Sequence, residues 1–160
     1  TTHIFDLARV LVGEVSTVFA QGTAQSRSAF PDADVFGASA ATLTFTRGAV
    51  GNMASTCLLN WPHRIGLHLF CEGMVIELSE ANMVVRTGDP IVARSPEVDP
   101  FLREDRAFID AVQGKENRIR VDYAEALKTH RLTTAAEESA RTGQVLRLEP
   151  EEVHSVESSL

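Results

Sequence analysis

Two sets of residues in this sequence have side chains that could act on a hydroxylated molecule. His3 lies near the start of the chain, and an imidazole with a pKa of about 6.5 can accept the proton of a hydroxyl or orient that hydroxyl. The second set lies in one short segment and comprises Asn60, Trp61, His63 and Arg64. Its aromatic plane, imidazole and guanidinium offer stacking and several hydrogen-bond donors, which suit a polyhydroxylated ligand.

Both sets also have a plain structural interpretation. Considered alone, His3 is an ordinary polar residue at the start of a helix, and segment 60–64 equally suits a turn that covers a sheet edge. His68 lies between two leucines in a predicted strand, where a solvent-facing or interface histidine is expected rather than a ligand. The five histidines are dispersed and no pair has the i, i+4 spacing of a helical zinc site, so no metal site is predicted.

The surrounding pattern predicts one helix, a run of strands, two further helices and a last strand. Apolar residues recur with helical spacing over residues 2–12 and stop at Gly13, a favoured helix C-cap. Successive β-rich runs joined by short glycine-containing turns favour an antiparallel or mixed sheet. The expected strands lie within 14–19, 35–46, 49–59, 65–71, 74–78, 82–86 and 144–148, and the later helices within 100–113 and 123–142.

This order predicts an α+β domain with one predominantly antiparallel or mixed open sheet of about six strands and helices on one face. The domain is expected over residues 1–148, and the acidic, serine-rich residues 149–160 are expected to form a mobile tail. Several strand positions are apolar, namely Leu43, Phe45, Val50, Met53, Leu58, Leu67, Leu69 and Val75. They outnumber the positions that one helical layer covers, so we expect a homo-oligomer packed through the open sheet face.

The composition excludes several classes of protein. The 160 residues are 44% hydrophobic and 23% charged, which is ordinary for a globular domain. The net charge of −7 repels a phosphate backbone, and no apolar run reaches the roughly 20 residues of a membrane helix. Neither nucleic acid nor a membrane is therefore an expected partner, and a cytoplasmic location is expected. Cys57 and Cys71 form no metal-ligand or redox spacing and are expected to be reduced residues of buried strands.

Five short strings, in this order and spacing, resemble the C-terminal domain of the Gfo/Idh/MocA family, which includes glucose-fructose oxidoreductase, inositol dehydrogenase and rhizopine-catabolism proteins. The resemblance covers about residues 2–148. The strings are Thr2-His3-x-x-Asp6-Leu7 running to Leu11-x-Gly13-Glu14-Val15, Phe45-x-x-Gly48-Ala49-Val50-Gly51, Glu72-Gly73-x-x-x-Glu77-Leu78, Phe108-Ile109-x-Ala111-Val112 and Ala135-x-x-Glu138-Ser139-Ala140-Arg141-x-Gly143.

The resemblance implies the C-terminal substrate-binding and oligomerisation half of a two-domain enzyme, whose N-terminal Rossmann domain binds NAD or NADP. His3 matches the histidine of the family's D-x-x-x-H motif, beside the hydroxyl that becomes a carbonyl, and Asp6 matches a following acid that supports it. The aspartate of that motif would precede Thr1. The chain contains no G-x-G-x-x-G and no counterpart of the family's Glu-Lys-Pro lysine, so it is expected to be inactive alone.

The sequence therefore predicts part of an NAD(P)-dependent oxidoreductase that acts on a CH-OH group of a sugar, cyclitol or related polyol. By position in the family, segment 60–64 is expected to contact that substrate. The opening at Thr1, already inside a periodic segment and without a methionine, predicts that sequence upstream is missing. Two alternatives stay open: a non-catalytic, sheet-mediated dimerisation or scaffold domain of the same fold, and a stand-alone sugar-binding domain.

Overall fold

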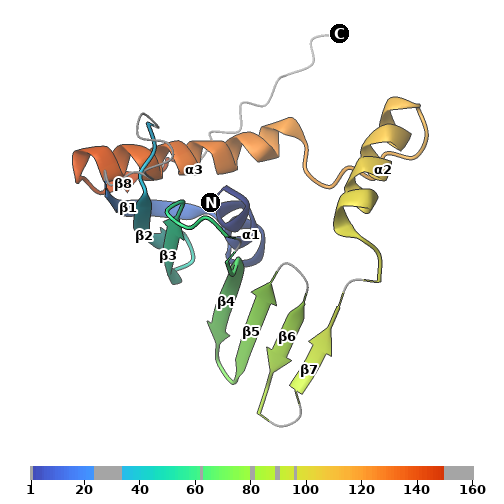
Figure 1. Cartoon of the computed structure of the whole chain (residues 1–160), viewed down its shortest axis with the longest axis horizontal. Coiled ribbons are helices and arrows are strands. Elements are labelled where there is room, and N and C mark those ends of the chain that lie inside the picture. The colour runs from blue at the N-terminus through green and yellow to red at the C-terminus, as the bar shows by residue number, and fades with distance from the viewer. Residues whose placement is uncertain are drawn as a thin grey trace. The chain divides into compact units, whose positions relative to one another are not determined.

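The computed structural model describes residues 2–23, 34–61, 63–79, 82–88, 91–95 and 97–149. Within these residues the helices are α1 (Thr2–Val12), α2 (Pro100–Val112) and α3 (Tyr123–Thr142). The strands are β1 (Val15–Thr23), β2 (Ala38–Phe45), β3 (Val50–Thr56), β4 (Gly66–Cys71), β5 (Met74–Ser79), β6 (Met83–Arg86), β7 (Ile91–Arg94) and β8 (Leu146–Arg147) (Figure 1). The chain divides into two compact units, one of Thr1–Asn60 with Thr129–Leu160 and one of Trp61–Lys128.

The first unit contains a four-stranded antiparallel sheet in the order β3-β2-β1-β8, which we call sheet A. Its β2–β3 hairpin turns at Gly48, whose φ of 88° is a conformation that glycine adopts without steric cost. The register between β1 and β2 shifts between Val15 and Thr17, which is the mark of a β-bulge at Ser16. The extra residue lets both Val15 and Val18 be buried although they are three positions apart.

Helices α1 and α3 cover one face of sheet A, and Figure 1 shows α3 beside its strands. Phe5 and Ala8 of α1 are one turn apart and face the sheet, as do Leu132 and Ala136 of α3. The core consists of Phe5, Ala8, Val15, Val18, Ala20, Ala41, Leu43, Phe45, Leu132 and Ala136. Each fully buried large side chain among them contributes about 1.5–3 kcal/mol, so this layer fixes α1 on the sheet.

The opposite face of sheet A carries small and polar side chains. By alternation along β2, Ala40 and Thr42 point away from the buried Ala41 and Leu43. Six of its residues help to line a shallow hollow of about 450 Å³, namely Phe19, Gln21, Ala40, Thr42, Asn52 and Ala54. Leu43 and Phe45, which the sequence suggested for an uncovered face, are instead buried under the helices, and Met53 packs against the same core.

The second unit contains another four-stranded antiparallel sheet, in the order β4-β5-β6-β7, which we call sheet B. Directly opposed residues share a face, so the register separates an apolar side from a charged side. The apolar side carries Leu67, Leu69, Ile76, Leu78, Met83 and Val85. The other side, which we call the charged side, carries His68, Glu77 and Arg86 beside Phe70, Val75 and Val84. Helix α2 begins after Asp99, whose carboxylate accepts a hydrogen bond from the Phe101 amide at 2.9 Å, and none of its residues is buried.

The predicted α+β class with antiparallel strands is confirmed, and α1 has the predicted bounds. The strands form two sheets of four rather than one sheet of about six. The prediction of buried cysteines is wrong: Cys57 and Cys71 are both exposed, because one follows the last residue of β3 and the other ends β4. None of the described helices is both long and apolar enough for a membrane span. The predicted tail from residue 150 onward lies outside the described residues.

Candidate functional site

His3 lies in the first turn of α1, and its side chain is exposed. Asp6 follows three residues later, so the two side chains are neighbours on the helix surface. The Asp6 side chain is 38% exposed and therefore reaches solvent on that side. The helix ends where the Gly13 amide donates to the Arg9 carbonyl at 2.9 Å, with Gly13 at a φ of 117°. The structure thus presents an imidazole beside a carboxylate on the accessible part of a helix that is otherwise packed on sheet A.

A hydrogen-bond network attaches this end of α1 to α3. Thr129 is 3% exposed, and its Oγ1 donates to Asp6 Oδ1 at 2.6 Å. The same Oγ1 accepts from Arg9 Nη1 at 2.6 Å, and that nitrogen lies 3.9 Å from Asp6 Oδ1. One hydroxyl therefore bridges an acid and a base of α1 from the neighbouring helix.

Arg9 also fixes α1 to the start of β1. Its Nε and Nη2 donate to the two carboxylate oxygens of Glu14 at 2.9 Å and 2.7 Å, which is the bidentate geometry of a strong ion pair. The Arg9 side chain is 2% exposed, whereas that of Glu14 is 54% exposed. We call Asp6, Arg9, Glu14 and Thr129 the α1 anchor. Because the anchor holds its helix from two directions, the position of His3 relative to sheet A is well defined.

Three members of the anchor, Arg9, Glu14 and Thr129, were not predicted from the sequence. A signal for Arg9 was present, since it lies four residues after Phe5 on the apolar stripe of the helix and only 5% of it is exposed. A charged residue on a buried stripe needs a partner of opposite charge, and Glu14 is the nearest acid that follows it. Nothing in the local sequence indicates Thr129, which is 120 positions from Arg9 along the chain.

The second set of candidate residues divides between the two units. Asn60 ends the first part of one unit, while Trp61, His63 and Arg64 open the other, and all four are exposed. Trp61 exposes 60% of its surface, which leaves its ring accessible for stacking. The structure brings Arg64 together with His68, because the guanidinium Nη2 donates to the imidazole Nε2.

Two more charged residues, Glu77 and Arg86, lie on the same side of sheet B as His68. Glu77 lies directly opposite His68 in the β4–β5 register, and its Oε1 accepts from Arg86 Nε at 3.0 Å. That hydrogen bond from Arg86 holds the pKa of the Glu77 carboxyl below its ordinary value. Burial partly opposes the shift, and the positive charges of Arg86, His68 and Arg64 add to it. Glu77 is therefore the shared counter-charge of this side.

The starts of α2 and α3 do not fit the pyrophosphate of a nicotinamide dinucleotide. A pyrophosphate is usually held at a glycine-rich turn before a helix N-terminus, where free amides meet it. Here the starts of α2 and α3 are each occupied by a carboxylate, since Asp99 accepts from Phe101 and Asp122 accepts from the Glu125 amide at 2.8 Å. These charges repel a phosphate. Within the described part of the chain, no three His, Cys, Asp or Glu side chains form a group that could hold a metal ion.

Comparison with known proteins connects this arrangement with a family. The family model described as the GFO/IDH/MocA C-terminal domain matches residues 1–77, which include α1, the α1 anchor up to Glu14, and segment 60–64. The comparison with curated proteins gives no match. Residues 1–77 therefore match the model of this domain family, and the resemblance seen in the sequence is confirmed over those residues.

Solved structures share the fold over nearly the whole chain. The WlbA dehydrogenase from Bordetella pertussis, in complex with NADH and UDP-GlcNAcA, is 25% identical, with a TM-score of 0.62 over 94% of this chain and 44% of its own. The aldose-aldose oxidoreductase from Caulobacter crescentus, complexed with glycerol, is 23% identical, with a TM-score of 0.70 over 92% and 45%. Levoglucosan dehydrogenase, in complex with NADH and levoglucosan, is 17% identical, with a TM-score of 0.72 over 94% and 49%. The chain thus spans about half the length of these structures.

Proposed function

We propose that this chain, whose residues 1–77 match the model of the Gfo/Idh/MocA C-terminal domain family, is the substrate-side half of an NAD(P)-dependent oxidoreductase. The full-length protein would oxidise a CH-OH group of a sugar, cyclitol or related polyol. NADH and sugar-type ligands in structures of the same fold support this proposal. The nucleotide would be bound by a part of the protein outside this chain, in line with the carboxylates at the starts of α2 and α3.

The observation that carries the proposal is the exposed imidazole of His3 on a helix fixed by the α1 anchor. Oxidation of an alcohol requires the hydroxyl to lose its proton, and a positioned imidazole can accept that proton or orient the hydroxyl. Asp6, one turn further along α1, would support the histidine electrostatically once it is protonated. Asn60, Trp61, His63 and Arg64 would contact the substrate through stacking and hydrogen bonds.

The test is the substitution His3→Gln in the full-length protein, assayed by the reduction of NAD or NADP with a panel of polyols. We expect kcat to fall about 10²–10⁴-fold, the usual contribution of a general acid or base, while the affinity for the nucleotide is unchanged. His130→Gln is the matched control, because His130 is an exposed histidine on α3. It should leave kcat as it is.

Two results would contradict the proposal. If His3→Gln and His130→Gln were equally active, His3 would have no part in the chemistry. If the full-length protein reduced neither nucleotide with any polyol, the scaffold interpretation of the same fold would replace the enzyme. The 160-residue chain by itself should be inactive in either case.

We further propose that the protein is a homo-oligomer joined through the open face of sheet A and that it is located in the cytoplasm. The hollow of about 450 Å³ on that face supports the first point, because the projecting Phe19 lies beside the small side chains of Ala40 and Ala54. On a two-fold axis, Phe19 of each subunit could pack against the small side chains of Ala40 and Ala54 of the other. The two free cysteines, Cys57 and Cys71, suit a reducing compartment.

A further inference from the structure

The charged side of sheet B has more cationic than anionic groups, although the whole chain has a net charge of −7. Among the described residues, Arg64, His68 and Arg86 gather around one carboxylate, that of Glu77. The carboxylate of Glu77 already accepts a hydrogen bond from Arg86, at 3.0 Å. Among the described residues no ion pair is formed by Arg64, whose side chain is exposed. An exposed guanidinium with no carboxylate of its own is the unexplained feature of this surface.

The partner of Arg64 is the imidazole of His68, which carries no negative charge to balance the guanidinium. A guanidinium only donates hydrogen bonds, so the imidazole Nε2 of His68 is the acceptor in this contact. Glu77 lies opposite His68 on β5, but its Oε1 is engaged by Arg86 from β6. Among the described residues, one carboxylate therefore serves two guanidinium groups and an imidazole, and most of the Arg64 donors have no acceptor from the protein.

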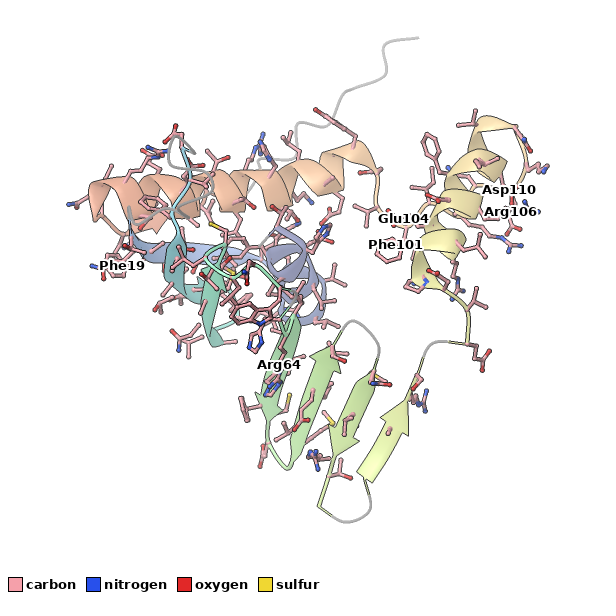
Figure 2. All side chains as sticks on the ribbon, viewed as in Figure 1. Phe19, Arg64, Phe101, Glu104, Arg106 and Asp110 are labelled. Carbon is pink, nitrogen blue, oxygen red and sulfur yellow. The ribbon has the colours of Figure 1, made fainter. Side chains whose placement is uncertain are left out.

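The positions of these donors suit a single small anion. Arg64 lies two residues before β4 (Figure 2), and His68 on that strand is within hydrogen-bond reach of it. β4 is an edge strand of sheet B, so a ligand can approach the pair from the side. Trp61 exposes 60% of its surface three residues before Arg64, and Phe70 exposes 78% two residues after His68, which adds apolar planes on the same segment.

The geometry points to a binding site for the carboxylate or phosphate of an acidic ligand, held by the guanidinium of Arg64 and the imidazole of His68, with Arg86 as the nearby second cation. A planar guanidinium matches the two oxygens of either group by paired hydrogen bonds. The site stands on sheet B alone. If the proposed oxidoreductase function also holds, the substrate is an acidic sugar derivative rather than a neutral polyol, and that further step rests on the proposed function.

The test uses the 160-residue chain and the NMR signals of its arginine and histidine side chains. The probes are D-glucuronate, D-glucose 6-phosphate and D-glucose, added separately at fixed ionic strength. We expect saturable shifts of Arg64 and His68 with at least one of the two anions and none with D-glucose. Saturation by glucuronate alone assigns the site to carboxylates, saturation by the phosphate alone assigns it to phosphates, and both results support the inference.

Matched variants separate the site from general charge effects. Arg64→Gln should weaken binding of the anion by at least about tenfold, because a charge-assisted hydrogen bond is lost. Arg64→Lys keeps the charge without the planar fork and should weaken it less. Arg47→Gln removes an exposed arginine at the β2–β3 turn and should leave the affinity unchanged.

The inference is overturned if neither anion gives saturable shifts, if D-glucose shifts the same signals equally, or if Arg47→Gln weakens binding as much as Arg64→Gln. Dispersed amide spectra of each variant establish that it is folded. Failure here leaves the oxidoreductase proposal untouched, because that proposal is decided by His3→Gln and nucleotide reduction in the full-length protein. Conversely, an inactive full-length protein would leave the anion site standing.

Discussion

Replacing Thr129 by valine tests whether the α1 anchor holds the helix that carries His3. Valine keeps the branched shape of threonine and removes only the hydroxyl. That hydroxyl accepts from Arg9 at 2.6 Å and donates to Asp6 at 2.6 Å, at a residue that is 3% exposed. The substitution therefore removes two hydrogen bonds to charged groups without opening a large cavity.

The expected cost follows from what each partner can do afterwards. The Asp6 side chain is 38% exposed and can exchange the lost bond for one to water, so its share is small. The Arg9 side chain is 2% exposed and loses an acceptor that water cannot easily replace, although its two bonds to Glu14 remain. Losing one buried partner of a charged donor costs about 1.5–3 kcal/mol. We expect a free energy of unfolding lower by about 2 kcal/mol, and a Tm lower by about 4–8 °C in a chain of this size.

The assay is unfolding in urea followed by the helical circular dichroism signal, with Thr134→Val as the matched control. Thr134 is exposed on the same helix, so its substitution should change stability by less than about 0.5 kcal/mol. A double-mutant cycle with Arg9→Met should show coupling of at least about 0.5 kcal/mol, as expected for residues in one network. Equal stability of Thr129→Val and Thr134→Val would refute the anchor as the element that fixes α1.

Two further predictions concern sheet A. Ser139 is fully buried, and its Oγ accepts from the Ala20 amide at 2.8 Å and donates to the Gln144 carbonyl at 2.5 Å. Ser139→Ala leaves the buried Ala20 amide unpaired and should lower the free energy of unfolding by about 1–3 kcal/mol in the same urea assay, so a loss below that range would contradict it. Ala40→Arg places a charge in the hollow of the open face and should reduce the oligomer to monomers in light scattering, whereas Ala126→Arg on the exposed side of α3 should not. A chain that is monomeric before substitution would contradict the interface.

The local structure was predictable from the sequence because turns and caps depend on single residue types. Gly13 and Gly143 end α1 and α3, with φ angles of 117° and 70°, as their positions after periodic segments indicated. Gly48 and Gly73 turn two predicted hairpins, with φ angles of 88° and 68°. In each case the glycine lies between two segments with regular hydrophobic periodicity. The few residues around it are therefore enough to predict the turn or the helix end.

Features that depend on distant residues were not predictable in the same way. Periodicity shows which side of a strand is apolar but not which strands share a sheet, so the division into sheets A and B was missed. Strand β7 was missed because its four residues give too short a pattern to separate from the turn before them. Thr129 and Ser139 owe their roles to groups more than 100 positions away, on Arg9 and Ala20. No local signal marks such a residue.

The contrast between Arg9 and Arg64 shows how surroundings assign different roles to one residue type. Arg9 is 5% exposed and is engaged by Glu14 and Thr129, so its charge is neutralised inside the fold and its effect is on stability. Arg64 is exposed, and within the described part of the chain its hydrogen-bond partner is the imidazole of His68, so most of its donors face solvent. A buried cation must be paired by the fold itself, because leaving it unpaired costs several kcal/mol. An exposed cation carries no such constraint, and where it stands beside other cations and an aromatic ring, an acceptor from outside the chain can bind to it.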